Sequence, residues 1–340
     1  MNPIRNLNRN ILRALFILIL LGTTWFFYEG LKSHWESLQL VELRLRTAGI
    51  LIALALVAVA YFLVTVVWHY GVNAHPSGGK VSLMESYAVV NTTQMTKYLP
   101  GKIWSYTLQT ILMRRRGVST SYLLYLNLFI TLSLIFSASL FGTLFVMAYS
   151  HRAPDILSVP VFLAVSAAYL GFIFLNGRVF KGIVQMVNRV FRKDIVFFEL
   201  PLPFLLKMQA ALILSNALFG LAGYATCYGI GCDIPAEMAF PVSAATLFSD
   251  MLGFVMFLSP GGLGIREGAM FFLLDGITNK RIALLLPLAL RIITMSSDLI
   301  LGLIGFVLLR KYAGKWENNA CCACQESTTQ AMEGPKSAGA

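Results

Sequence analysis

The stretch SPGGLGIREG, residues 259–268, interrupts a moderately apolar segment that covers residues 239–276. Proline and glycine break helices, so the Pro260-Gly261 pair predicts two short helices joined by an irregular tip. Such a tip is tolerated at membrane depth only when it is buried in protein or lines a water-filled cavity. We therefore expect a re-entrant helical hairpin. The alternative is an ordinary, kinked span over residues 239–258, which would reverse the topology of everything downstream.

A second segment, residues 85–110, has the same character and contains LPGKIW at residues 99–104. It is too polar for a simple span, and Pro100-Gly101 interrupts it near its centre. We expect a second re-entrant hairpin with these two residues at its tip. The two Pro-Gly pairs are 160 residues apart.

A shift of 160 residues aligns the apolar runs of the two halves and places Gly142 on Gly302. Each half then contains two spans, a hairpin and a third span. Three crossings per half force the halves into opposite orientations, which predicts an inverted repeat of residues 10–150 and 155–310. Many secondary transporters are built in this way, and their interrupted segments lie at the substrate site.

The overall composition places the chain in a membrane. Of the 340 residues 57% are hydrophobic and only 13% are charged, whereas soluble domains have about 25% charged residues. The apolar residues form runs of about 20, the length that crosses a hydrocarbon core of about 30 Å. We predict an all-α polytopic protein with one integral-membrane domain, residues 1–312, and a disordered cytoplasmic tail, residues 313–340. The predicted spans are residues 12–29, 47–69, 120–149, 157–176, 204–230 and 281–309.

Lysine and arginine gather in short loops beside the spans, as the positive-inside rule describes. With the N-terminus in the cytoplasm, Arg114-Arg115-Arg116, the loop around residues 178–193 and the tail are all cytoplasmic. Six spans then put both termini on the cytoplasmic side of the inner (plasma) membrane. The net charge of +11 is therefore a signal of topology, and we expect no nucleic-acid partner.

Two ionisable residues lie well inside the last span, in PLALRIITMSSDLILGLIGF at residues 287–306. A charge at the centre of a span costs at least about 2.5–3.5 kcal/mol, so it needs a reason. Arg291 and Asp298 are spaced so that they share one helical face. We expect Arg291, as an unpaired cation, to bind an anionic headgroup with Asp298 beside it. The alternatives are a structural ion pair, or a helix-packing seam that continues through Gly302 and Gly305.

The second hairpin adds further candidates for headgroup binding. Asp250 lies in its first arm, and Arg266-Glu267 opens its return arm. Free N–H groups at the start of the return helix favour a phosphate or a carboxylate, and Arg266 strengthens this preference. Gly262 and Gly264 would let the backbone approach a ligand or another helix closely.

In the first hairpin, Lys97 and Lys102 flank the Pro-Gly pair in a similar manner, which makes Lys102 a candidate ligand as well. The alternative is that both lysines snorkel to the membrane interface. If the lysines are ligands, the ends of both hairpins face one cavity between the two repeats.

No residues assemble into a hydrolytic triad, a zinc set or a redox site, so we expect no metal, no cofactor and no catalytic residue. Cys321, Cys322 and Cys324 are one thiolate short of a four-cysteine zinc site. We expect them to be reduced thiols in a mobile tail, with lipidation as the alternative.

The run SPGGLGIREGA, residues 259–269, resembles the signature of the lysylphosphatidylglycerol synthase transmembrane region, and LPGKIW resembles the first conserved turn of that family. The resemblance covers residues 10–312. It carries a functional role to the following residues only: Pro260, Gly261, Gly262, Gly264, Arg266, Glu267 and Gly268.

In two-part members of that family, the membrane region is taken to flip an aminoacylated phospholipid, and a fused cytoplasmic domain transfers lysine to phosphatidylglycerol. The resemblance implies a stand-alone member without the synthase domain. We therefore expect a flippase or transporter, not an enzyme, whose cargo is a phospholipid, an aminoacyl-phospholipid or an isoprenoid-linked lipid. The alternatives are a membrane-embedded headgroup transferase and a non-transporting partner of a separate lipid-modifying enzyme.

Overall fold

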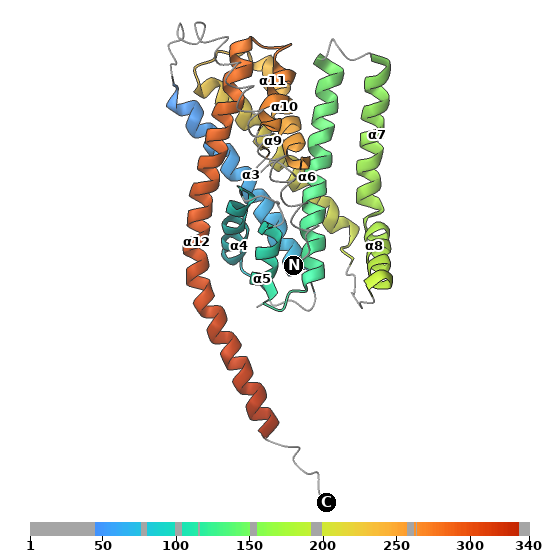
Figure 1. Ribbon diagram of the computed structural model, residues 1–340, viewed down its shortest axis with the longest axis vertical. Coiled ribbons are helices and arrows are strands. Elements are labelled where there is room, and N and C mark those ends of the chain that lie inside the picture. Colours follow the sequence, from blue (N-terminus) through green and yellow to red (C-terminus); the bar gives the residue numbers. More distant parts are fainter. Residues whose placement is uncertain are drawn as a thin grey trace, which may run out of the picture.

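The computed structural model describes residues 45–75, 80–98, 104–114, 116–149, 155–191, 199–256, 262 and 264–332. Over these residues the chain is helical, with no strand (Figure 1). In chain order the helices are α3 (Thr47–Asn73), α4 (Leu83–Gln94), η1 (Met95–Tyr98), α5 (Trp104–Arg114), α6 (Thr120–Tyr149), α7 (Asp155–Phe174), α8 (Asn176–Phe191), α9 (Leu202–Gly229), η2 (Ala236–Met238), α10 (Ala239–Val255), α11 (Ile265–Leu274) and α12 (Lys280–Met332).

Five helical stretches of the described residues are long and apolar enough to cross a membrane. Four of them, α3, α6, α9 and the Lys280–Tyr312 part of α12, coincide with predicted spans. The fifth, Ala236–Val255, falls on the segment for which the sequence leaves both a hairpin arm and an ordinary span open. The chain is therefore a multi-pass membrane protein. The first predicted span, residues 12–29, lies outside the described residues.

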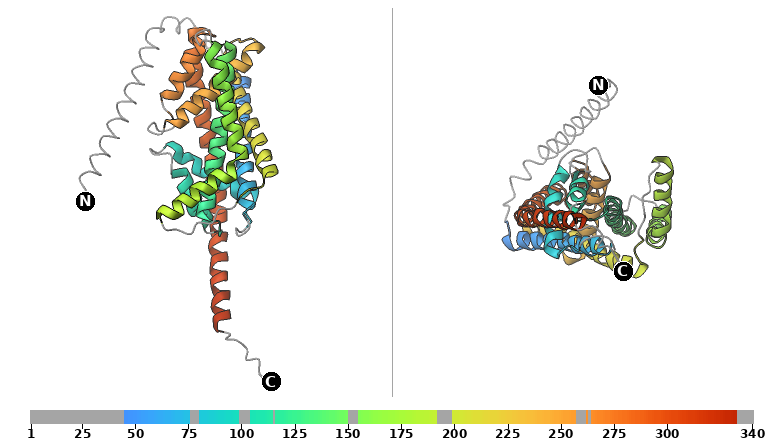
Figure 2. Two further views of the ribbon diagram at one scale, coloured as in Figure 1. Left: turned by 90° about the vertical axis from the view of Figure 1, so that its right-hand side faces the viewer. Right: turned by 90° about the horizontal axis from the view of Figure 1, so that it is seen from below.

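The helix α7 covers most of the predicted span over residues 157–176, but it is long and apolar enough to cross a membrane only together with the helix that follows it. The axis bends by 72° between Val159–Phe174 and Asn176–Met186, where α8 begins. As a result α8 runs crosswise to the long helices at the lower end of the bundle (Figure 2).

The most extensive helix contact of the bundle is the antiparallel packing of α3 against α9. The two helices meet so closely at Gly49 and Gly229 that a Cβ atom on Gly49 would lie 2.5 Å from the backbone nitrogen of Gly229. Further along, the Ser215 hydroxyl donates a hydrogen bond to the carbonyl oxygen of Ala60 at 2.9 Å. Small residues let apolar helices approach closely where no water drives them together.

Two pairs of short helices occupy opposite ends of the bundle. In Figures 1 and 2, α4 and α5 lie in the lower part and α10 and α11 in the upper part. The first helix of each pair packs on a long helix of the other half of the chain, α4 on α12 and α10 on α6. Gly302 of α12 faces Met95, and Gly142 of α6 faces the ring of Phe248. Gly302 and Gly305 therefore form the packing seam that was an alternative reading of the sequence.

Each pair has a local signal that starts one of its helices. In α4, Ser82 and Glu85 form a capping box, with the Glu85 amide donating to Ser82 Oγ and the Ser82 amide donating to Glu85 Oε2. At the start of α11, the backbone amide of Gly264 donates a hydrogen bond to Glu267 Oε2 at 2.7 Å. Gly264 itself has a φ of 83°, which an L side chain rarely adopts.

The approach to α11 turns back onto α10. Gly262 has a φ of 71°, and a Cβ atom there would lie 2.8 Å from the carbonyl oxygen of Gly253. The expected close approach is therefore present at Gly262, and the backbone approaches another helix. The predicted tip residues Pro100, Gly101, Pro260 and Gly261, and also Lys102, lie outside the described residues.

The last helix, α12, continues to Met332, well into the segment (residues 313–340) for which the sequence predicts disorder. Between Gly314 and the Gly334-Pro335 pair the chain contains no glycine or proline, so nothing in it interrupts the helical backbone earlier.

Candidate functional site

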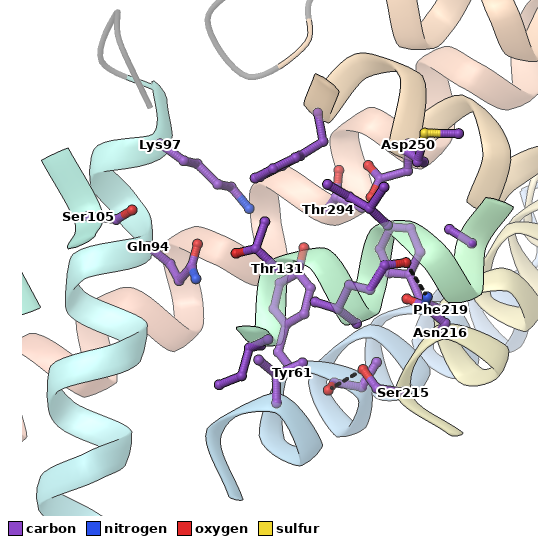
Figure 3. A pocket seen from close by; sticks show the side chains of 18 of the residues that line it. Tyr61, Gln94, Lys97, Ser105, Thr131, Ser215, Asn216, Phe219, Asp250 and Thr294 are labelled. Atoms are coloured by element: carbon purple, nitrogen blue, oxygen red, sulfur yellow. Dashed lines mark hydrogen bonds between the residues drawn. The ribbon is translucent and has the colours of Figure 1, made fainter. Parts of the chain in front are cut away.

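A cavity of about 260 Å³ lies where the two helix pairs and the long helices meet (Figure 3). Its described walls come from α3, α4, η1, α5, α6, α9, α10, α11 and α12. The cavity therefore has residues from both halves of the chain around it, and five of its lining residues are charged. The charged groups lie in three ion pairs.

The first ion pair joins the two halves of the chain. Lys97 in η1 places its Nζ 2.7 Å from both carboxylate oxygens of Asp298 in α12. The Asp298 side chain is only 3% exposed, and the Lys97 side chain is 31% exposed. In Figure 3 the Lys97 side chain extends from the α4 side of the cavity toward its centre. The structural ion pair left open for Asp298 is present, and Lys97 is its partner.

The second ion pair lies within the upper helix pair. Arg266 at the start of α11 places Nη1 2.6 Å from Oδ1 of Asp250 in α10. The arginine side chain is 13% exposed, whereas the Asp250 side chain is 41% exposed. Nη2 of Arg266 is buried and has no hydrogen-bond partner among the described residues. Asp250 therefore has room to move away, and Arg266 keeps one donor available.

The third ion pair corrects the expectation that Arg291 is an unpaired cation. Arg291 in α12 lies 3.5 Å from Oε1 of Glu267 through its Nη1, and both side chains are almost fully buried. A charge-assisted hydrogen bond typically measures 2.7–2.9 Å, so this distance is about 0.6 Å too long for one. Glu267 thus has two tasks, because it also caps α11 through the amide of Gly264.

The remaining wall is neutral and polar. The Tyr106 hydroxyl and Thr131 Oγ1 lie 2.7 Å apart. Two amide side chains are almost fully buried, and each has one polar atom without a hydrogen-bond partner among the described residues, namely Gln109 Oε1 and Asn127 Nδ2. Their other atoms are used, since Gln109 donates to Thr93 and Asn127 accepts from the Trp68 indole. Buried polar atoms of this kind cost free energy unless a ligand or water satisfies them.

Two aromatic rings complete the cavity. Tyr61 of α3 and Phe219 of α9 stack with centroids 6.4 Å apart. Lys97 Nζ lies 5.3 Å from the centroid of Tyr61, and the guanidinium of Arg266 lies 5.5 Å from that of Phe219. Both distances are within the range of cation–π attraction. The rings therefore hold the two cations at the cavity.

The structure brings together most of the residues predicted for the site. Asp250, Arg266, Arg291 and Asp298 line the cavity, and Glu267 lies behind Arg291. Gly262 and Gly264 shape the approach to α11 and do not line the cavity. Lys102 lies outside the described residues.

Sequence reasoning missed Lys97 as a site residue, because snorkelling explained it equally well. It also missed the buried amides of the neutral wall. A signal for them exists, since Asn127 and Asn216 are amide side chains in the middle of apolar spans, where polar groups are expensive.

Within the described residues, no group of three or more histidine, cysteine, aspartate or glutamate side chains is placed to hold a metal ion. Cys227 and Cys232 are buried free thiols. Comparison of the chain with protein-family models, with curated proteins and with solved structures found no match. The family resemblance of the sequence motif therefore stays a prediction.

Proposed function

We propose that this protein is an inner-membrane transporter that moves a lipid with a polar or anionic headgroup across the bilayer, with the headgroup in the central cavity. The observation that carries the proposal is the set of three ion pairs around that cavity, inside a multi-pass apolar bundle. Ionisable residues at membrane depth are costly, and by default they mark a pathway for a polar substrate.

The ion pairs suit a headgroup that binds reversibly. An anionic group that enters the cavity competes with Asp250 for Arg266, and Asp250 is the more exposed partner of that pair. The buried Nη2 of Arg266 supplies one additional donor. Arginine recognises phosphate and carboxylate through such paired N–H groups.

The size of the cavity supports a headgroup as the bound part. Pockets for drug-sized ligands measure about 300–1,000 Å³, and this cavity, at about 260 Å³, is smaller. The acyl or isoprenoid chains would therefore stay in the bilayer while the headgroup crosses.

The proposal includes two re-entrant hairpins and an inverted repeat. It is supported by the position of the α4/α5 and α10/α11 pairs at opposite ends of the bundle. It is also supported by the packing of α4 on α12 and of α10 on α6, which the shift of 160 residues interchanges. In both contacts a glycine at the aligned position, Gly142 or Gly302, faces the short helix. Both termini would be cytoplasmic.

The test is lipid movement in proteoliposomes that contain the full chain and phosphatidylglycerol or phosphatidylethanolamine labelled with NBD on an acyl chain. Dithionite bleaches only the outer leaflet unless lipid crosses the bilayer. We expect nearly complete bleaching with the wild type, and outer-leaflet bleaching alone with the Arg266→Ala/Arg291→Ala variant.

A matched control breaks an ion pair far from the cavity. Arg46 and Asp233 interact at 2.7 Å at the end of α3, outside the cavity wall. The Arg46→Gln/Asp233→Asn variant should transport like the wild type. Unchanged transport in the cavity variant, with normal folding by size-exclusion chromatography, would contradict the site.

Two other functions give different results. A headgroup transferase changes the chemical species of lipid in a deletion strain, whereas a transporter changes only their distribution between leaflets. A non-transporting partner co-purifies with a soluble lipid-modifying enzyme and moves no lipid alone.

A further inference from the structure

Helix α8, with the sequence NGRVFKGIVQMVNRVF, differs from every other helix around it because it separates charge and apolar surface on different faces. Arg178, Lys181 and Arg189 are exposed and fall within an arc of about 80° at 3.6 residues per turn. Val179, Ile183 and Met186 form a second exposed face, about 120° away around the helix.

The position of α8 is fixed by contacts at its first turns. Tyr125 of α6 donates a hydrogen bond from its hydroxyl to Asn176 Oδ1 at 2.8 Å. The Tyr125 ring also meets the Phe180 ring edge-on, with centroids 4.8 Å apart. With the 72° bend after α7, these contacts hold α8 crosswise at the lower end of the bundle (Figure 2).

The apolar face of α8 is not covered by the protein that the structure describes. Val179 is 48% exposed, Ile183 49% and Met186 69%. A helix with one basic face and one apolar face, lying across the direction of the spans, has the properties of an interfacial helix. Its apolar side chains reach the acyl boundary while its cations meet the headgroups.

We propose that α8 lies in the plane of the membrane surface and binds anionic phospholipid headgroups through Arg178, Lys181 and Arg189. The occupant is the negatively charged leaflet, because the exposed charges of this face are all positive. This binding surface is separate from the central cavity, since α8 contributes no described lining residue. It holds whether or not the protein transports lipid.

The depth of the two faces is measured with nitroxide labels at Gln185→Cys and Met186→Cys, one at a time, in proteoliposomes. Serine replaces Cys321, Cys322 and Cys324, and the buried Cys227 and Cys232 are retained. We expect the label at position 186 to be accessible to oxygen and the label at position 185 to a water-soluble nickel chelate. If both labels are accessible to oxygen, α8 continues the span inside the hydrocarbon core. If both are accessible to the nickel chelate, α8 leaves the membrane. Either result overturns the proposal.

The headgroup preference is measured with spin-labelled phosphatidylglycerol and phosphatidylcholine. We expect the full chain to associate preferentially with phosphatidylglycerol, and the Arg178→Gln/Lys181→Gln/Arg189→Gln variant to lose most of this preference. About 1 M NaCl, where the Debye length is about 3 Å, should have the same effect on the wild type.

The control variant Lys280→Gln/Arg281→Gln removes charge from the start of α12, at the other end of the bundle, and should keep the preference. A triple variant that retains the preference, or a control that loses as much, would overturn the assignment of the site to α8.

Discussion

The two helix pairs at the cavity lie at opposite ends of the bundle (Figure 1) and differ in the chemistry of their side chains. A shift of 160 residues places Tyr106 on Arg266 and Thr131 on Arg291. Tyr106 of α5, in the lower pair, shares a neutral hydrogen bond with Thr131 of the neighbouring helix α6. At the aligned positions, Arg266 of α11, in the upper pair, and Arg291 of the neighbouring helix α12 are each paired with a carboxylate instead.

Helices in corresponding places of the bundle therefore carry neutral side chains in one half of the chain and charged side chains in the other. Neutral hydroxyl groups cost less to bury than charges do, and the charges at the upper pair are offset by carboxylate partners. Among the described residues, the first half of the chain contributes one charge to the cavity, Lys97 of η1, and this charge pairs with Asp298 of the other half.

The largest effect is expected from Glu267→Ala in the upper pair. Glu267 is buried, caps α11 and pairs with Arg291, so its removal should cost about 3–5 kcal/mol of the free energy of unfolding in detergent. The aligned residue of the lower pair is the exposed Thr107, and Thr107→Ala should change that free energy by no more than about 0.5 kcal/mol. Similar losses in the two variants would show that the pairs are not chemically distinct.

A double-mutant cycle tests the link between the pairs. Asp298→Leu alone puts an apolar side chain opposite Lys97 and removes its carboxylate partner, which should cost about 3 kcal/mol. Lys97→Met/Asp298→Leu should recover most of this loss, because an apolar pair can replace a buried ion pair, with a coupling free energy of about 0.5–3 kcal/mol. We expect the double variant to fold and yet to transport poorly. Additive stability losses would mean that the two residues do not interact.

Two glycines of the SPGGLGIREG motif can be compared with each other, with smaller expected effects on the free energy of unfolding. Gly262→Ala combines a positive φ with a Cβ atom placed against Gly253, and should cost about 2–3 kcal/mol of the free energy of unfolding. Gly268 lies in α11 with open space around it, so Gly268→Ala should stabilise by up to about 1 kcal/mol. Chemical denaturation of the two variants measures both; equal effects would contradict the tight approach at Gly262.

The smallest effect is expected at the exposed Arg46–Asp233 pair, outside the cavity. The hydrogen bond and charge of Arg46 lower the pKa of Asp233 from its ordinary value of 3.8. A lowered pKa in the folded state means that the stabilisation is complete above the ordinary pKa and is lost as the pH falls through the lowered one. The small difference in thermal stability between wild type and Asp233→Asn should therefore shrink on acidification below pH 4. A difference that grows would contradict this pairing.

The local sequence pattern was sufficient to predict the long helices of the fold. The apolar runs predicted α3, α6, α7, α9 and the membrane part of α12, because crossing a hydrocarbon core requires a run of that length and composition. The pattern was not sufficient for the bend after α7. The turn dipeptide Asn176-Gly177 lies at the junction, but it marks only where the predicted span ends and not the direction in which the next helix leaves.

The sequence by itself determined that this is a multi-pass helical membrane protein, and that Arg291 and Asp298 share a face of the last span. These conclusions depend on composition and on the 3.6-residue period, which are local. Only the tertiary structure decided that Asp298 meets Lys97, 201 residues away, and that Arg291 meets Glu267. Partners for buried charges are chosen by how the helix pairs pack across the bundle, and no spacing along the chain contains that information.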